Sequence, residues 1–163
     1  MNARALIAIP PLMLALAACP AANPPYTVLN PSDYHVFVAP WDPADQPFCA
    51  AFQSAADWEA RMHPAASMGQ NTFAPPTEIW RDHAVVLMAR ETNPGDPAHF
   101  FTVTGVTKST DADALDVHIT FTPPPASTFT IVAYVAVEVP KPLPHVIHFN
   151  ENGRDVCEIR PSA

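Results

Sequence analysis

The stretch Thr128 to Val139, TFTIVAYVAVEV, decides the fold of this chain. It is rich in β-branched and aromatic residues and holds neither Gly nor Pro, and prolines bound it at Pro125 and Pro140. This composition and these boundaries predict a strand. Side chains alternate between the two faces of a strand, and here both faces are largely apolar. We therefore expect this strand to be central in a sheet that is covered on both sides.

Shorter patterns predict the elements around this strand. The unbroken apolar run Ala84 to Ala89 predicts a buried strand, and the alternation in Leu115 to Phe121 predicts a strand with one wet face. Ser54 and Asp57 form a capping-box pattern, so a short helix should follow to about His63. The other expected strands are 34–38, 100–106 with a bulge at Gly105, 145–150 and 154–160.

The dipeptide Asn152-Gly153 is typical of a two-residue type I′ turn and predicts a hairpin between the last two strands. The expected register has three opposite pairs, Phe149 with Asp155, Ile147 with Cys157 and His145 with Ile159. In this hairpin one face carries Ile147, Phe149, Cys157 and Ile159, so Cys157 should point inward. The sum of these patterns is a β-rich α+β fold, a mostly antiparallel sheet or sandwich of about seven strands with one short helix.

The N-terminus has the form of a secretory signal, with Arg4 followed by the uncharged apolar segment Ala5 to Ala18. The next residue completes the sequence Leu-Ala-Ala-Cys19, which resembles the lipobox of bacterial lipoproteins. The resemblance implies cleavage before Cys19 and diacylglycerol with fatty acyl chains such as palmitate on its thiol. We expect a signal peptide at 1–18, the lipidated Cys and a Pro-rich tether at 19–33, and a single domain at 34–163. Ordinary cleavage near Ala18 is the alternative and would give a secreted protein.

Charge and cysteine content narrow the classes of function. The chain has a net charge of −8, and loss of Arg4 with the signal would leave seven Lys and Arg against sixteen Asp and Glu. No basic patch is available for a nucleic-acid backbone, so we expect no nucleic-acid partner. Cys49 and Cys157 remain as an even pair in an exported chain, which predicts a disulfide. A catalytic cysteine is the alternative, but QPFCAA around Cys49 does not resemble a cysteine-protease signature.

The order of the segments resembles the PrcB-like domain, named for a bacterial lipoprotein that associates with and stabilises a surface protease complex. The segments are SAADW at 54–58, HAVVLMA at 83–89, LDVHITF at 115–121, a Pro-rich link, 131–137, EVPK at 138–141 and HVIHF at 145–149. The resemblance covers about 48–150 and implies an accessory, binding role without a catalytic residue. It departs at a turn where those domains often carry Thr-Gly-Gly-Tyr and this chain has Asn93-Pro94-Gly95-Asp96.

Sequence patterns that would predict a catalytic or metal-binding site are weak. His145 and His148 are three apart, so on a strand they point to opposite faces and cannot share an ion without a bulge. Asp111, Asp113 and Asp116 lack the Gly and terminal Glu of an EF-hand loop. The chain holds no Gly-x-Ser-x-Gly elbow, although a hydrolase built from distant residues remains an alternative.

We therefore expect a non-enzymatic protein of the cell envelope, anchored through Cys19 and facing the periplasm or the cell surface. Its β-rich domain should bind, and can stabilise, another exported protein such as a protease. The expected partner surface comprises Trp41, Trp80, Asn93, His99, Phe100 and Phe101. The alternative is a lipoprotein of the periplasm or surface that binds a small ligand or a metal ion through its histidines.

Overall fold

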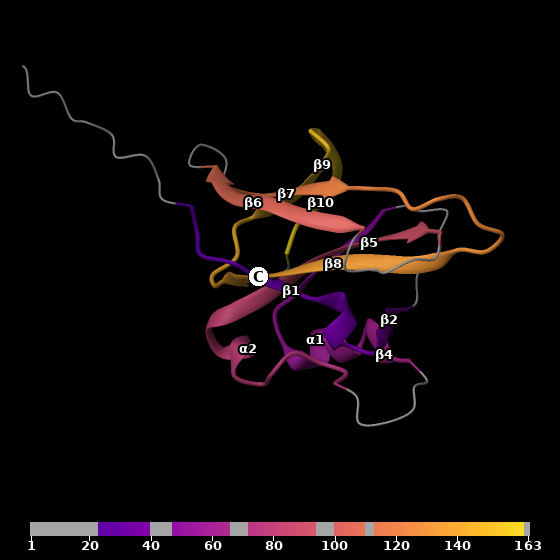
Figure 1. The fold of residues 1–163 in the computed structure, drawn as a ribbon. Helices are drawn as coiled ribbons and strands as arrows, with labels where there is room; N and C mark the ends of the chain where they lie inside the picture. The colour runs from indigo at the N-terminus through magenta and orange to yellow at the C-terminus, as the bar shows by residue number, and fades with distance from the viewer. Residues whose placement is uncertain (1–22, 40–46, 66–71, 94–99, 110–112, 162–163) are drawn as a thin grey trace, which may run out of the picture.

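A computed structural model describes residues 23–39, 47–65, 72–93, 100–109 and 113–161. The described chain forms three layers, with two four-stranded sheets and a third layer of short helices and a two-stranded ribbon (Figure 1). The first sheet has the order β1 (Thr27–Leu29), β8 (Ile131–Pro140), β5 (His83–Thr92) and β3 (Phe48–Phe52). The second has the order β10 (Arg154–Ile159), β9 (Val146–Glu151), β7 (Ala114–Phe121) and β6 (Phe101–Ser109).

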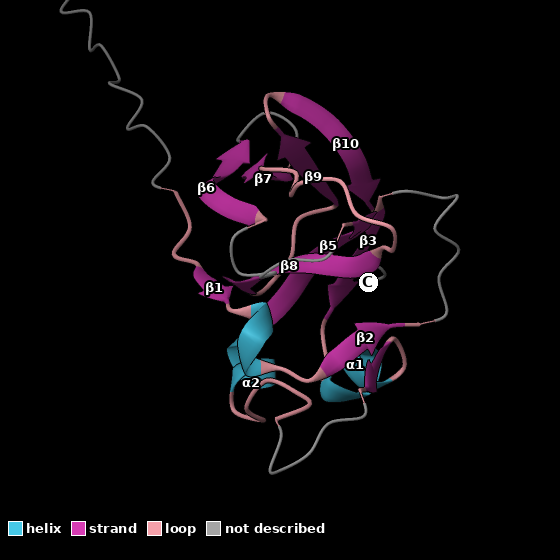
Figure 2. Cartoon of the chain, turned by 45° about the vertical axis from the view of Figure 1, so that its right-hand side comes forward, coloured by secondary structure: helices cyan, strands magenta, loops and turns pink. Residues whose placement is uncertain are grey.

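The third layer covers the face of the first sheet that points away from the second (Figure 2). It contains the ribbon of β2 (Val36–Val38) and β4 (Met62–Pro64), the 3-10 turn η1 (Pro31–Asp33), α1 (Ala55–Glu59) and α2 (Ile79–Asp82). The predicted β-rich α+β class is confirmed, with ten strands and two short α-helices among the described residues. Three strands were not predicted, β1, β3 and β4, because β1 and β4 have three residues each and β3 is FCAAF, whose alanines have low strand propensity.

β8 is buried on both faces through its middle, as its sequence predicts. Val135 and Val137 face the second sheet, whereas Tyr134 and Ala136 face the third layer. β5 pairs with β8 along its whole length, antiparallel, from His83 opposite Pro140 to Thr92 opposite Ile131. The strand begins later than expected: Thr128, Phe129 and Thr130 precede it, and Phe129 is 62% exposed.

The second sheet contains the one parallel pair of the described strands, β7 with β9, and its other pairs are antiparallel. The predicted bulge at Gly105 is confirmed, because the register of β6 on β7 shifts between Val103 and Gly105. Alternate residues of β7, Leu115, Val117 and Ile119, are buried against the first sheet, as the alternation predicts.

The hairpin of β9 and β10 has the predicted turn, and both turn residues have positive φ, 51° for Asn152 and 82° for Gly153. The predicted register is wrong: the two-residue turn places Asn150 opposite Asp155, and a bulge between Asp155 and Cys157 then places Cys157 opposite Phe149. Phe149 was expected opposite Asp155, so the displacement is two residues. A strand alternates with a period of two, and the predicted inward face of the hairpin is therefore preserved.

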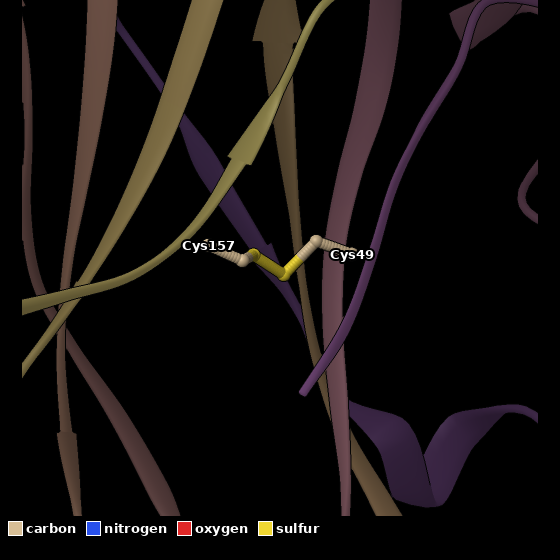
Figure 3. The surroundings of a disulfide bond; sticks show 2 residues. All are labelled: Cys49 and Cys157. Atoms are coloured by element: carbon tan, nitrogen blue, oxygen red, sulfur yellow. A yellow bond between two sulfur atoms is a disulfide. The ribbon is translucent and has the colours of Figure 1, made fainter. Parts of the chain in front are cut away.

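The predicted disulfide is present and joins Cys49 of β3 to Cys157 of β10, whose Cα atoms are 6.6 Å apart (Figure 3). It links an edge strand of the first sheet to an edge strand of the second. An ion pair makes another connection between the sheets: Arg90 Nη1 of β5 lies 2.7 Å from Glu151 Oε1 of β9. The same guanidinium lies over the ring of Phe121, 4.6 Å from its centroid.

The first helix has the predicted cap but ends earlier than predicted. The Asp57 N–H donates to Ser54 Oγ at 3.1 Å, and the Asp57 carboxylate accepts from the Gln53 N–H at 3.1 Å. The helix ends at Glu59, not near His63, because the residue before Pro64 favours extended backbone and Met62–Pro64 pairs with β2.

The predicted boundary between tether and domain at residue 34 is also wrong. β1 and η1 belong to the predicted tether, yet β1 pairs with β8 and Leu29 is buried in the core. The folded domain therefore includes the chain from Thr27 onward. The run Tyr-Thr-Val-Leu at 26–29 has the composition of a strand, but it stands between Pro25 and Pro31.

Candidate protein-binding edge

Three aromatic residues of the predicted partner surface are core residues. Trp80 is 9% exposed and packs with Trp58 in the core under the first sheet. Phe100 and Phe101 are 4% and 8% exposed and belong to the core between the sheets. The prediction is wrong for these three residues because burying a large ring stabilises the fold, and their neighbours leave little of each ring accessible to a partner.

The remaining predicted positions do not define a surface either. Asn93 is half-buried, and its side-chain oxygen accepts a hydrogen bond from the Ser127 N–H at 3.3 Å. This hydrogen bond therefore links the loop before β8 to the end of β5. Trp41 and His99, together with Cys19, lie outside the described residues.

The structure instead shows an open stretch of sheet edge on β8. β1 pairs with β8 at three positions, from Thr27 opposite Glu138 to Leu29 opposite Ala136. No described strand pairs with Ile131–Val135 on the side away from β5. We call this stretch the β8 edge. In a strand flanked on one side only, every second residue directs its N–H and C=O away from the sheet, where another strand can bind them.

Exposed apolar side chains flank this stretch near both of its ends. Of the large apolar residues that are exposed in the described chain, two lie on or beside β1, Tyr26 and Val28. Val132 lies at the start of β8, and Phe129 lies two residues before the strand. The others, Phe37 and Phe73, belong to the third layer. Exposed apolar side chains beside unpaired backbone are typical of a surface that binds protein.

A hollow of about 210 Å³ lies where β1 leaves β8. Its walls include Val28 and Leu29 at the end of β1, Tyr134 and Val135 on β8, and the side of Phe101 from β6. More apolar than polar surface lines this hollow. It can therefore receive an apolar side chain from a strand that lies along the β8 edge.

Tyr134 keeps the chain after β1 away from this edge. Its hydroxyl donates to the carbonyl oxygen of Pro31 at 3.5 Å and so ties η1 to the face of β8. Burial raises the pKa of Tyr134, and Tyr34 and Asp33 nearby raise it further. The hydroxyl is therefore protonated at neutral pH and available as a donor, and η1 lies beneath the sheet rather than beside Ile131–Val135.

The edge of the second sheet on this side differs from the β8 edge. β6 carries the bulge between Val103 and Gly105, and it has an exposed lysine at Lys108. Bulges and edge lysines are features that prevent a strand from pairing with another chain. The β8 edge has neither a bulge nor a charged residue nor proline between Ile131 and Val135.

Among the described histidines, His145 and His148 do not converge on one point. His148 Nδ1 lies 2.9 Å from Asp116 Oδ1, and its Nε2 lies 3.7 Å from Glu158 Oε2, so the carboxylates lie at opposite sides of the ring. His145 lies instead beside Asp113, with 3.8 Å between Nε2 and Oδ2. Among the described residues no group of three or more His, Cys, Asp or Glu could hold a metal ion.

Comparison with protein-family models, with curated proteins and with solved structures gave no match. Within the described part of the chain, every helix is too short or too polar to cross a membrane.

Proposed function

We propose that this chain is a non-enzymatic, lipid-anchored protein of the bacterial cell envelope whose β-rich domain binds another exported protein, such as a protease, and stabilises it. The observation that carries the proposal is the β8 edge, a stretch without a strand partner among the described residues, with exposed Val132 on it, exposed Val28 of β1 next to one end and exposed Phe129 just before the other. Soluble proteins usually shield such edges, and an unshielded edge is a site at which another chain can bind.

Two further observations support the location and the kind of partner. The disulfide between Cys49 and Cys157 suits an oxidising compartment outside the cytoplasm, and the segment ending at Cys19 has the form of a lipoprotein signal. The order of segments resembles a domain that associates with a surface protease complex, which supports an exported protease as the partner.

Affinity capture from the detergent-solubilised envelope of the host tests the binding function. The protein is expressed at its native level, and we expect one exported protein to be recovered in stoichiometric amount. An empty capture would contradict the proposal. If, in addition, Zn²⁺ or Cu²⁺ raised the melting temperature, the metal-binding alternative would be supported.

Fractionation of a Cys19→Ala variant tests the anchor. Several acyl chains at about 0.8 kcal/mol per buried CH₂ group hold a protein firmly on a membrane. We expect the wild-type protein in the membrane fraction and the variant, without a thiol to acylate, in the soluble fraction or in the precursor form. Equal membrane association of the two proteins, both processed, would contradict lipidation at Cys19.

A further inference from the structure

The β8 edge also indicates how a partner binds. We infer that the partner supplies one extended segment, neutral or positively charged, that joins the first sheet as a strand beside Ile131–Val135. This inference rests on the proposed binding function and adds the mode of binding and the chemistry of the segment. The segment would occupy the line of β1, beyond the point where β1 ends at Leu29.

β1 shows that this side of β8 accepts a strand. Its three residues bind Ala136–Glu138 in antiparallel register, and the chain then turns into η1 at Pro31. An incoming strand would extend the same ladder of hydrogen bonds by Ile131–Val135. β8 is already held straight by its continuous pairing with β5, so the edge is ordered before the partner arrives.

Side chains beside the edge fit an alternating apolar segment. Residues of a strand on this edge would point alternately toward the second sheet and toward the third layer. One side chain could enter the hollow between Val28, Phe101 and Val135. On the other side, Val132 is 38% exposed and would be covered by an apolar neighbour, with Phe129 near the end of the segment.

The net charge favours another protein over a second copy of this chain as the source of the added strand. The net charge of −8 makes two copies repel one another, although the edge itself is uncharged. Exposed acidic residues lie near it: Glu91 is opposite Val132 on β5, and Asp33 is in η1. A basic segment is therefore attracted by this field and a neutral one is not repelled, whereas an acidic segment is repelled.

Synthetic peptides of about nine residues, long enough to cover the open stretch, test this inference with the full-length mature protein in detergent micelles. All peptides share a core of alternating Val and Thr. The first has lysine flanks, the second has glutamate flanks, and the third has lysine flanks with N-methyl groups on every second backbone nitrogen. N-methylation removes strand hydrogen bonds while the side chains are unchanged, so the third peptide is the matched control.

Fluorescence anisotropy measures binding, and hydrogen exchange measures protection of the backbone amides. We expect the first peptide to bind and to protect outward-directed amides of Ile131–Val135. The N-methylated peptide should bind at least about tenfold more weakly, since only a bound strand needs those donors. The glutamate-flanked peptide should also bind more weakly, and added salt should reduce the difference between the two flank types.

Variants of the protein locate the binding site. Val132→Lys places a charge on the β8 edge and Phe129→Lys places one just before it, and each should weaken binding of the first peptide at least about tenfold. Phe37→Lys is the control, because Phe37 is 47% exposed but lies on β2, and its binding should match the wild type. Circular dichroism shows whether each variant is folded, and the peptide comparison on the wild-type protein does not depend on any variant.

Four results would overturn the inference: no peptide binds, the N-methylated peptide binds equally well, protection lies away from Ile131–Val135, or these amides become protected because the protein alone dimerises at the low ionic strength of the peptide experiment, where the acidic chains repel one another. The two proposals fail separately. If Val132→Lys captured the partner as well as the wild type did, the proposed binding function would stand, but the β8 edge would not be the binding site. If the envelope capture recovered no partner but a peptide protected the amides of the β8 edge, the strand-binding mode would stand and the proposed function would be contradicted.

Discussion

The two long sides of the sandwich are closed in different ways. On one side, edge strands β3 and β10 are joined by a covalent bond between Cys49 and Cys157. On the other side, β8 and β1 lie near β6 without a disulfide, and the β8 edge stays unpaired among the described strands. Stability and accessibility are therefore placed on opposite sides of the molecule. The linked side restrains the two sheets, and the open side retains backbone groups for another chain.

Removing the disulfide should have the largest effect on the free energy of unfolding. The double variant Cys49→Ala/Cys157→Ala should lose about 2 to 5 kcal/mol of unfolding free energy, because the cross-link closes a long loop in the unfolded chain. The sequence separation of the two cysteines is 108. Urea unfolding of both proteins measures the loss, and wild type treated with a reductant is the control. Equal stability of the oxidised and reduced wild type would show that the closed side does not depend on the bond.

The next effect concerns β1 on the open side. Leu29→Ala removes a buried side chain from the core beneath the first sheet and should cost about 2 to 3 kcal/mol. Val28→Ala in the same strand is the matched control; Val28 is 45% exposed, so its loss should cost less than about 1 kcal/mol. Hydrogen exchange should show the amides of Ala136–Glu138 becoming unprotected only in Leu29→Ala. Equal effects of the two variants would mean that β1 is not anchored by burial.

These two sides also differ in how far the sequence could predict them. β8 was predictable because Val135, Ala136 and Val137 make both of its faces apolar, and the disulfide was predictable from an even cysteine pair. The turn at Asn152-Gly153 was predictable from local backbone preference. The bulge beside Cys157 was not, since one extra residue in a ladder depends on how both strands pack.

The candidate site could not be predicted, because an open edge is a property of strand order. Nothing local in Ile131–Val135 shows that β1 ends at Leu29 and leaves these residues unpaired. Residue type alone also led to wrong predictions of the partner surface. Trp80 and Phe101 were chosen as large aromatic residues, and long-range packing decides whether such rings are core or surface.

The pH dependence of stability tests the role of Tyr134, whose hydrogen bond ties η1 to the sheet. Its pKa is raised in the folded protein, chiefly by burial, so the protonated hydroxyl stabilises the fold fully below the ordinary tyrosine pKa of about 10. This stabilisation is lost as pH rises above about 10, at up to about 1.4 kcal/mol per pH unit.

The variant Tyr134→Phe removes the ionising group and should lose stability less steeply above that pH. At neutral pH it should cost about 0.5 to 1.5 kcal/mol, because the hydrogen bond to Pro31 is lost. Urea unfolding over a series of pH values measures both effects. The assignment fails if the alkaline slope of Tyr134→Phe matches that of the wild type.

The smallest effect on stability is expected where the open side is changed at its surface. Val132→Lys replaces an exposed residue, so the unfolding free energy should stay within about 0.5 kcal/mol of the wild type. Its association behaviour should nevertheless change. An unshielded edge pairs with other chains as protein concentration rises, and an edge lysine opposes that pairing.

Light scattering at high salt, where the repulsion between acidic chains is screened, separates these two properties. We expect the wild type to form larger species with increasing concentration and Val132→Lys to stay monomeric. Phe37→Lys, which removes an exposed ring from β2, should behave as the wild type. If Phe37→Lys suppressed association as strongly as Val132→Lys, the association would follow general apolar exposure. A selective effect of Val132→Lys would instead assign it to the backbone of β8, which is the feature that distinguishes the open side from the side closed by the disulfide.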